Sequence, residues 1–345
     1  MIGHHNTFAA RFEVLRNNAV FATLYDMDSS VEIANTADSA LKMTIRGNFA
    51  DYSDEIDFLT DRLRPVITIN DVDYPCGVFV ITTETKTRSD GVEGYALEGY
   101  SLLYLAERKK IETPLYIAAG TNYITAIVNL LTTCGLTNID AESTSYTFAT
   151  DRQDWEVGTS VLDIVNQLLA EISYNSAWVD LSGAVRLTKY EQPSISTVDH
   201  IYNSGEYSLL EDYYEITRDR FSKCNVFRVT CENPELDSPM VATSINDSED
   251  SPYSVSKMGR ILYTEDVDNI PSQVALQAYA DKLKYQSLQT TEAVVFRTAI
   301  VPEHESFDVV ALELGDMVGI YTETEWRIPI SAGGTMEHKA RRIIL

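Results

Sequence analysis

Apolar and polar residues alternate along much of the first 110 positions, and a spacing of two is typical of half-buried β-strands. This pattern predicts strands within 11–25, 41–45, 65–69, 77–83 and 94–100. Asn17 and Asn18 separate two apolar runs, and asparagine tolerates the positive φ of a tight hairpin turn. Positions 102–109 have the pattern of a short helix. We therefore expect a small β-rich domain with one attached helix over 1–110.

Between 111 and 200 the apolar spacing changes to the period of a helix. Within 121–134 apolar residues recur at i, i+3, i+4 and i+7. A longer apolar stripe over 161–172 follows Ser160, which begins a capping-box pattern. The Ser-Gly pair at 182–183 separates two strand-like runs, which predicts a hairpin. These features indicate a compact α/β insert over 111–200.

Strand-like patterns return from 201 to 345. They cover 226–231, 240–245, 260–263, 292–301, 309–314, 317–321, 327–330 and 336–344. One helix is predicted to start near Pro271, because proline is favoured in a first turn. Its buried side is predicted to hold Ala275, Ala278, Tyr279 and Leu283. The chain is thus expected to be α+β and mainly β, with two barrel or sandwich domains, each with a packed helix, around the insert.

The charge balance excludes several functions. Among the 345 residues, 27 Lys and Arg oppose 52 Asp and Glu, which gives a net charge of −25. Such a surface repels nucleic acid and anionic lipid, and Lys and Arg adjoin one another only at 108–110 and 341–342. No apolar run approaches the roughly 20 residues of a spanning helix, so we expect no membrane insertion. A hydrophobic fraction of 44% indicates a globular protein.

Four cysteines, at 76, 134, 224 and 231, are too scattered for a disulfide framework or a zinc ribbon. Cys224 and Cys231 fall in one strand-like run, where a separation of seven places them on opposite faces. The start of the chain lacks an export signal. These observations predict reduced thiols in a protein that is made and assembled in the cytoplasm.

Motifs for nucleotide binding or nucleophilic catalysis are incomplete. The segment 94–99 has phosphate-loop glycine spacing, but Tyr and Ser at 100–101 replace the required Lys and Ser/Thr. Ser-x-x-Lys occurs at 39–42 and 254–257 without a companion Lys-Thr-Gly. The histidines, at 4, 5, 200, 304 and 338, lack metal-ligand spacing. We therefore predict no catalytic residue, no cofactor and no metal site.

Two other functions stay open at this stage. With 52 acidic residues, a carboxylate pair could cleave a glycosidic bond, which would make the chain a peptidoglycan-degrading hydrolase. Twenty tyrosines and three tryptophans could instead serve a receptor- or sugar-binding module. The run Asp212–Glu215, with two tyrosines, is interpreted as interface or loop material.

The C-terminal region has a characteristic order of features. A strand, a Leu-Gly-Asp turn and a second strand occupy 312–320, and the segment 327–336 leads into a final strand. The helix near Pro271 and a long strand around 294–296 precede them, and the segment 94–101 runs into a helix in the first half. In this order and over nearly the whole chain, the sequence resembles the baseplate hub proteins of phage tails and contractile injection systems.

The resemblance implies a structural function without enzymatic activity. In that family the hub is a homotrimer of chains with two tail-tube-like domains, so three chains form a pseudo-sixfold ring. The ring joins the tail tube or tube-initiator subunits to the central spike and continues the lumen. Baseplate wedge and tape measure proteins are further implied partners. No fused wall-degrading domain is expected after the last strand, and phage and bacteriocin particles both fit.

If the chain lines such a channel, its negative charge has a function there. An acidic wall would repel passing DNA and keep it from adhering. The sequence therefore predicts that acidic side chains concentrate on the face toward the lumen.

Overall fold

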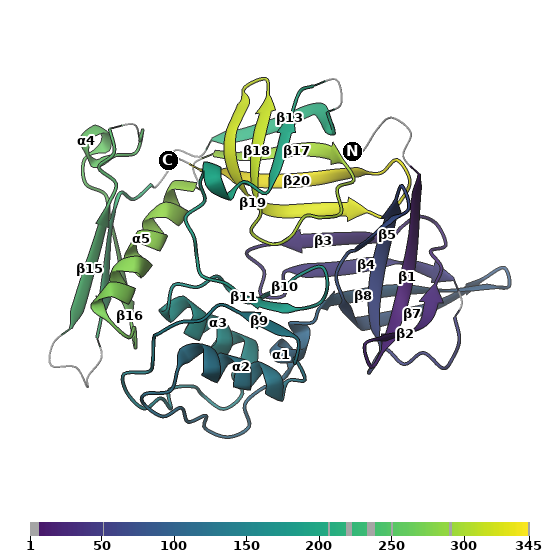
Figure 1. Ribbon diagram of the computed structural model, residues 1–345, viewed down its shortest axis with the longest axis horizontal. Coiled ribbons are helices and arrows are strands. Elements are labelled where there is room, and N and C mark those ends of the chain that lie inside the picture. Colours follow the sequence, from purple (N-terminus) through teal and green to yellow (C-terminus); the bar gives the residue numbers. More distant parts are fainter. Residues whose placement is uncertain are drawn as a thin grey trace.

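The computed structural model describes residues 7–50, 52–205, 208–218, 223–232, 239–249, 251–289 and 292–343. The fold is α+β and mainly β, as predicted. One broad sheet runs across the molecule, with a helical unit on one side of it and a small helix-covered sheet at the far end (Figure 1).

The N-terminal strands form a closed antiparallel barrel. Its neighbouring strands are, in order, β4 (Met43–Ala50), β8 (Val92–Ser101), β7 (Phe79–Ser89), β5 (Arg62–Ile69), β1 (Phe8–Arg16) and β2 (Ala19–Leu24). Beyond β2 the chain returns to β4 and closes the barrel. The Ala50 amide donates to the Tyr25 carbonyl, and Asp26 forms an isolated antiparallel β-bridge with Phe49. Asn17 and Asn18 both have positive φ, which confirms the predicted hairpin turn.

The barrel interior is filled by the inward-facing residues of these strands. Phe12 and Phe49 meet edge to face, with ring centroids 5.2 Å apart, and Leu63, Ile67 and Phe79 are fully buried. The connection at 70–75 contains the short strand β6 (Val72–Pro75), which pairs with β5.

Strand β3 (Glu32–Thr36) connects this barrel to the C-terminal strands. It pairs with β4 on one side and with β19 (Met317–Pro329) on the other, both antiparallel. The segments 317–321 and 327–330 were predicted as two strands, and that is wrong, because they belong to the single strand β19. A register shift between Glu323 and Glu325 lets the strand continue through its polar middle.

The sheet continues from β19 into a second β unit. Its further strands are β12 (His200–Asn203), β13 (Leu210–Arg218), β17 (Glu292–Ala299), β18 (Val309–Leu314) and β20 (Thr335–Arg342). They enclose a separate core that contains Tyr202, Phe296 and Tyr321. Asp212–Glu215 lie in β13, where the half-buried Tyr214 packs on this core, so the loop alternative for this run is wrong and the interface alternative stays a prediction.

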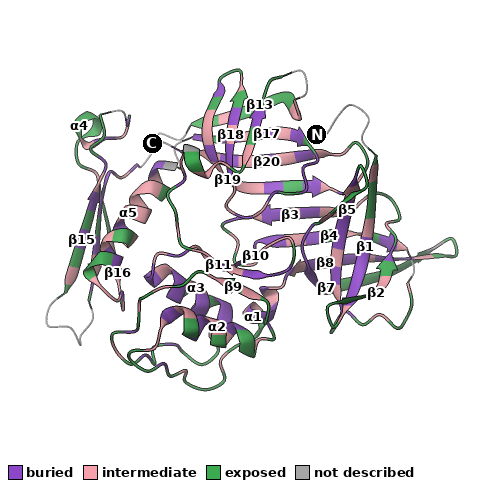
Figure 2. Cartoon of the chain, in the orientation of Figure 1, coloured by how far each residue is buried: buried purple, intermediate pink, exposed green. Residues whose placement is uncertain are grey.

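The insert is an α/β unit, as expected. It contains α2 (Tyr123–Thr133), α3 (Val161–Glu171), β9 (Ile139–Ala141), β10 (Trp178–Val179) and β11 (Val185–Leu187). The helix predicted for the first domain, α1 (Tyr104–Arg108), packs into the core of this insert instead, and that prediction is corrected. The Ser160 hydroxyl accepts from the Asp163 amide and caps α3, and the predicted apolar stripe of this helix is buried (Figure 2). The hairpin turn at Gly183 has a positive φ.

A third sheet lies apart from the broad one. It consists of β15 (Met240–Ile245), β14 (Val226–Cys231) and β16 (Leu262–Val267), and α5 (Gln273–Gln289) covers one of its faces (Figure 1). The prediction that α5 packs on the second barrel is therefore corrected, because its apolar side contacts β14 and β15. The short elements α4 (Val255–Met258) and the 3-10 helix Ile195–Thr197 complete the described fold.

Two details of α5 and β14 differ from the predictions. The helix begins at Gln273, two residues after Pro271, and its fully buried side chains are Ala275, Leu276 and Ala280, whereas the predicted Ala278 is exposed. Cys224 precedes β14 instead of lying in one strand with Cys231, and all four cysteines are free thiols.

Lys282 joins α5 to the insert and allows a test of this contact. Its Nζ donates to the Tyr174 carbonyl at 2.7 Å, and burial lowers the pKa of this lysine to about 8 from 10.5. Between pH 8 and pH 10.5 Lys282 is therefore protonated in the unfolded chain and largely neutral in the folded protein. Its contribution to the free energy of unfolding increases with pH in this range. From pH 7.5 to 9.5 the free energy of unfolding should increase by about 2 kcal/mol relative to a Lys282→Met variant. Parallel pH curves from urea denaturation of the two proteins would contradict the buried contact.

Candidate functional site

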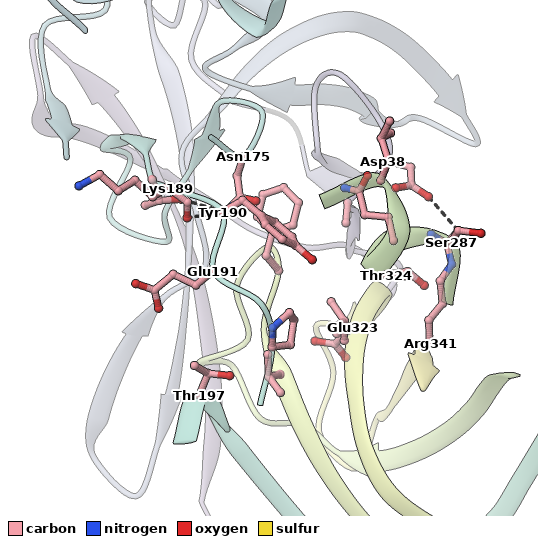
Figure 3. Close-up of a pocket in the computed structure, with 18 of the residues that line it drawn as sticks. Asp38, Asn175, Lys189, Tyr190, Glu191, Thr197, Ser287, Glu323, Thr324 and Arg341 are labelled. Carbon is pink, nitrogen blue, oxygen red and sulfur yellow. Dashed lines mark hydrogen bonds and ion pairs between the residues drawn. The ribbon is translucent and has the colours of Figure 1, made fainter. Parts of the chain in front are cut away.

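A cleft of about 890 Å³ lies where the insert, α5 and the C-terminal strands meet. One wall is formed by the middle of β19, with Glu323 and Thr324, and by Arg341 of β20 (Figure 3). The insert contributes the segment 188–191, and the C-terminal part of α5 contributes Ser287. The site therefore depends on the mutual packing of three parts of the chain.

The charge of this cleft is mainly negative. Its lining includes the carboxylates of Asp38, Glu142, Glu191, Asp199 and Glu323, with Lys189 and Arg341 as the cations. Arg341 donates to Asp38 at 2.9 Å, and Lys189 lies 4.0 Å from Glu142. Because both cations face carboxylates of this lining, an anionic ligand such as a phosphate would meet a repulsive surface.

A cluster of histidines is buried around Glu323, behind the cleft. His304 comes from the loop between β17 and β18, and His338 comes from β20. Nδ1 of His304 lies 2.7 Å from Glu323 Oε2, and Nδ1 of His338 lies 2.5 Å from Glu323 Oε1. His200 of β12 stacks on His304, with ring centroids 3.9 Å apart, and its Nε2 lies 3.1 Å from Asp308.

The Nε2 atoms of His304 and His338 each lie within hydrogen-bonding distance of a hydroxyl group. Nε2 of His304 lies 2.6 Å from the Tyr202 hydroxyl, and Nε2 of His338 lies 2.8 Å from the Thr298 hydroxyl. Hydroxyl, imidazole and carboxylate thus follow one another as they do in catalytic triads. Thr298, His304 and His338 are 0% exposed and Tyr202 is 5% exposed, so a substrate cannot reach either hydroxyl.

The two buried carboxyls of this cluster have opposite pKa shifts. Burial raises the pKa of the Glu323 carboxyl, but His304 and His338 outweigh burial and lower this pKa to about 2. For Asp308 burial dominates and raises the pKa, although the contact with His200 opposes it. Glu323 is therefore ionised at neutral pH and needs positive charge beside it.

The motif residues considered in the sequence do not assemble into sites. The glycines at 94–99 lie in β8. The ammonium group of the buried Lys42 donates to Ala37 and Ser176, and that of Lys257 donates to Glu249, so the contacts of each ammonium group are to residues other than the serine of its own Ser-x-x-Lys motif. All three tryptophans are buried, which removes them as sugar-stacking platforms. The histidines at 4 and 5 lie outside the described residues.

The sequence did not reveal the histidine cluster. His200, His304 and His338 are far apart in the chain, and the pairing of β12 with β18 and of β19 with β20 brings them together. A weak signal was present, since Glu323 interrupts the apolar pattern of β19 and His338 interrupts that of β20. Within the described ranges, no helix is both long and apolar enough to cross a membrane.

No protein-family model and no curated protein matches the sequence. Solved structures match over nearly the whole chain. The tail protein from Neisseria meningitidis MC58 aligns with a TM-score of 0.64 at 12% identity and covers 96% of each chain. The 43 kDa tail protein of prophage MuSo2 from Shewanella oneidensis aligns with a TM-score of 0.65 at 8% identity, over 97% of this chain and 98% of its own. The chain has the fold of phage tail proteins.

A third structure links this tail-protein fold to secretion systems. The E. coli c3393 protein aligns with a TM-score of 0.50 at 10% identity, over 99% of this chain and 77% of its own. It is described as a component of the type VI secretion system with structural similarity to T4 bacteriophage tail proteins gp27 and gp5. The predicted resemblance to tail and baseplate proteins is thereby confirmed for the fold. Because one fold can serve several functions, the function itself requires separate support.

Proposed function

We propose that the chain is a non-enzymatic structural hub in the baseplate of a phage tail or a phage-derived contractile particle. The main support is the tail-protein fold, which extends over almost the whole chain. The buried histidine cluster supports it as well, because its hydroxyls are closed to a substrate. The particle is proposed to assemble in the bacterial cytoplasm, and the chain to lie between the tail tube and the central spike.

We further propose that three copies form a ring. Each chain has two β units with separate cores, joined through β3 and β19. Three such chains would present six β units, which suits a sixfold tube on one side and a threefold spike on the other. In this proposal 1–110 and 201–345 are the tube-like domains, and 111–200 is the insert between them.

Native mass spectrometry of the purified chain tests the ring. The expected result is a trimer, either alone or after addition of the tube and spike subunits of the same particle. A chain that stays monomeric at micromolar concentration and binds neither subunit would contradict the proposal. Incubation with purified peptidoglycan is the companion assay, and cleavage that is lost in a single carboxylate variant would instead favour a hydrolase.

The proposed lumen has an electrostatic test. Acidic side chains are expected to concentrate on the face of the ring toward the channel, because an acidic wall repels passing DNA. The trimer structure would show this distribution directly. A neutral or basic channel would remove this role for the net charge of −25.

A further inference from the structure

The carboxylates of Glu323 and Asp308 lie in the protein without a strong cationic partner. Glu323 is 2% exposed, and its bonding partners are the imidazoles of His304 and His338. Asp308 accepts from the Glu305 amide and contacts His200. In the described part of the chain neither carboxylate pairs with a lysine or an arginine. A buried ionised carboxylate requires compensating positive charge, so a cation suits this cluster.

The hydrogen bonds of Thr298 allow a metal-binding tautomer of His338. The Thr298 hydroxyl lies 2.8 Å from the Ala299 carbonyl, to which it can donate. A hydroxyl that donates there accepts from Nε2–H of His338, which is also 2.8 Å away. In a neutral imidazole of that tautomer Nδ1 keeps its lone pair, and this atom lies 2.5 Å from Glu323 Oε1. These two acceptors together would then face a cation.

A metal ion explains the arrangement with less repulsion than extra protons do. The His200 and His304 rings are stacked 3.9 Å apart, and the His304 and His338 rings are 4.8 Å apart. Positive charge on several of these imidazoles would place like charges side by side in a buried region. One divalent cation would balance the carboxylate charge of Glu323 without positive charge on these imidazoles.

We propose that His304, Glu323 and His338 bind a divalent transition-metal cation, with Zn²⁺ as the ion that this ligand set fits best. Their ligand atoms lie within 4.8 Å of one another, and all three residues are buried. Imidazole nitrogen and carboxylate oxygen are zinc ligands at about 2.0–2.2 Å. Asp308 lies 3.7 Å from His304 Nδ1 and is the nearest candidate for a fourth position.

The surroundings have the features of a second shell around a metal. Histidine ligands commonly hold their other ring nitrogen in a hydrogen bond, which fixes the ring orientation. The Tyr202 and Thr298 hydroxyls occupy these positions beside His304 and His338. Tetrahedral zinc ligands are about 3.3 Å apart at these bond lengths, so Glu323 would move outward by less than about 1 Å.

Such an ion would stabilise the junction of the two β units. It would tie the His304 loop to β19 and β20, beside the point where β19 pairs with β3. The same loop contacts the insert, because the Leu181 amide donates to Glu305 at 3.0 Å. His304, Glu323 and His338 are at most 2% exposed, which suits a structural site. This inference does not depend on the proposed function.

Metal analysis of the full chain tests the site. Protein expressed in zinc-supplemented medium and then desalted should contain about one Zn²⁺ per chain by mass spectrometry. A Glu323→Gln variant should retain less than about a tenth of that amount, in line with the loss on changing groups at metal sites. Glu325→Gln is the matched control, because Glu325 lies on the same strand and pairs with Lys339, and it should keep the full zinc content.

A second measurement uses the unaltered chain and so does not depend on how the variants fold. Refolding in the presence of Co²⁺ should give visible absorption bands of a four-coordinate site with nitrogen and oxygen ligands. Wild-type protein with less than about 0.1 Zn²⁺ per chain and no Co²⁺ bands would overturn the proposal. A proton between His338 and Glu323 would then supply the positive charge.

Discussion

Replacing Trp326 by alanine is expected to lower the free energy of unfolding by about 3–5 kcal/mol, the range for large aromatic truncations in a core. Trp326 is 1% exposed and belongs to the core of the first barrel, although β19 comes from the C-terminal part of the chain. In the sheet Trp326 lies opposite Asn35 of β3, and the Trp326 Nε1 donates to the Glu305 carbonyl at 3.2 Å. The substitution therefore leaves a cavity at the point where the two β units join.

Val318→Ala provides the control for this prediction. Val318 lies on the same strand, is 51% exposed, and should change stability by no more than about 0.5 kcal/mol. Urea denaturation followed by circular dichroism measures both variants. A loss below about 1 kcal/mol for Trp326→Ala would show that β19 does not stabilise the first barrel as the structure indicates.

Replacing Arg152 by methionine is expected to lower the free energy of unfolding at pH 7 by about 3–5 kcal/mol. Arg152 and Glu171 are both buried in the insert, and Arg152 Nη1 donates to Glu171 Oε2 at 2.9 Å. The Tyr123 hydroxyl donates to the same oxygen. Without the guanidinium, the ionised carboxylate of Glu171 remains buried without a cation, and this accounts for the large effect.

The pH dependence of this variant distinguishes a lost charge pair from lost packing. Burial already raises the pKa of Glu171 in the wild type, and removal of Arg152 should raise it further. The folded variant then takes up a proton at a higher pH than the unfolded chain, so its stability increases relative to wild type as the pH falls from 7 to 5. The additional change Glu171→Leu should restore part of the loss at pH 7. A deficit that is the same at both pH values would attribute the effect to packing alone.

Features set by neighbouring residues were predictable from the sequence. The hairpin at Asn17 and Asn18, the cap at Ser160 and the buried stripe of α3 all depend on contacts within a few positions. The pairing of β3 with β19 joins segments almost 300 residues apart, and no local pattern encodes it. The prediction divided β19 into two strands, because polar residues in its middle interrupt the apolar alternation. Pairing with the neighbouring strands keeps β19 continuous through this segment.

The histidine cluster shows the same limit for a site. Each of its residues follows an ordinary local pattern, and only the order of β12, β18, β19 and β20 in the sheet brings the imidazoles to Glu323. In α5 the weak amphipathic pattern correctly indicated Ala275 but also led to Ala278, whereas the core at the third sheet contains Leu276 and Ala280 instead. The sheet that α5 contacts therefore determines which side of the helix is buried, and the helical period alone does not predict it.

The resemblance to tail proteins rested on the order of short motifs, and it is confirmed at the level of the fold. The domain limits at 110 and 200, the trimer and the partners remain proposals. Their physical basis is that the chain has two β cores joined by one sheet, which allows two tube-like surfaces to be held in a fixed relation.

The most direct test of the central proposal is an electron cryomicroscopy reconstruction of the assembled particle in which this chain is located. The account predicts a ring of three copies between the end of the tail tube and the spike, with the two β units of each chain alternating around an open channel. A reconstruction that places the chain at another position, or as an isolated copy on the particle surface, would contradict it.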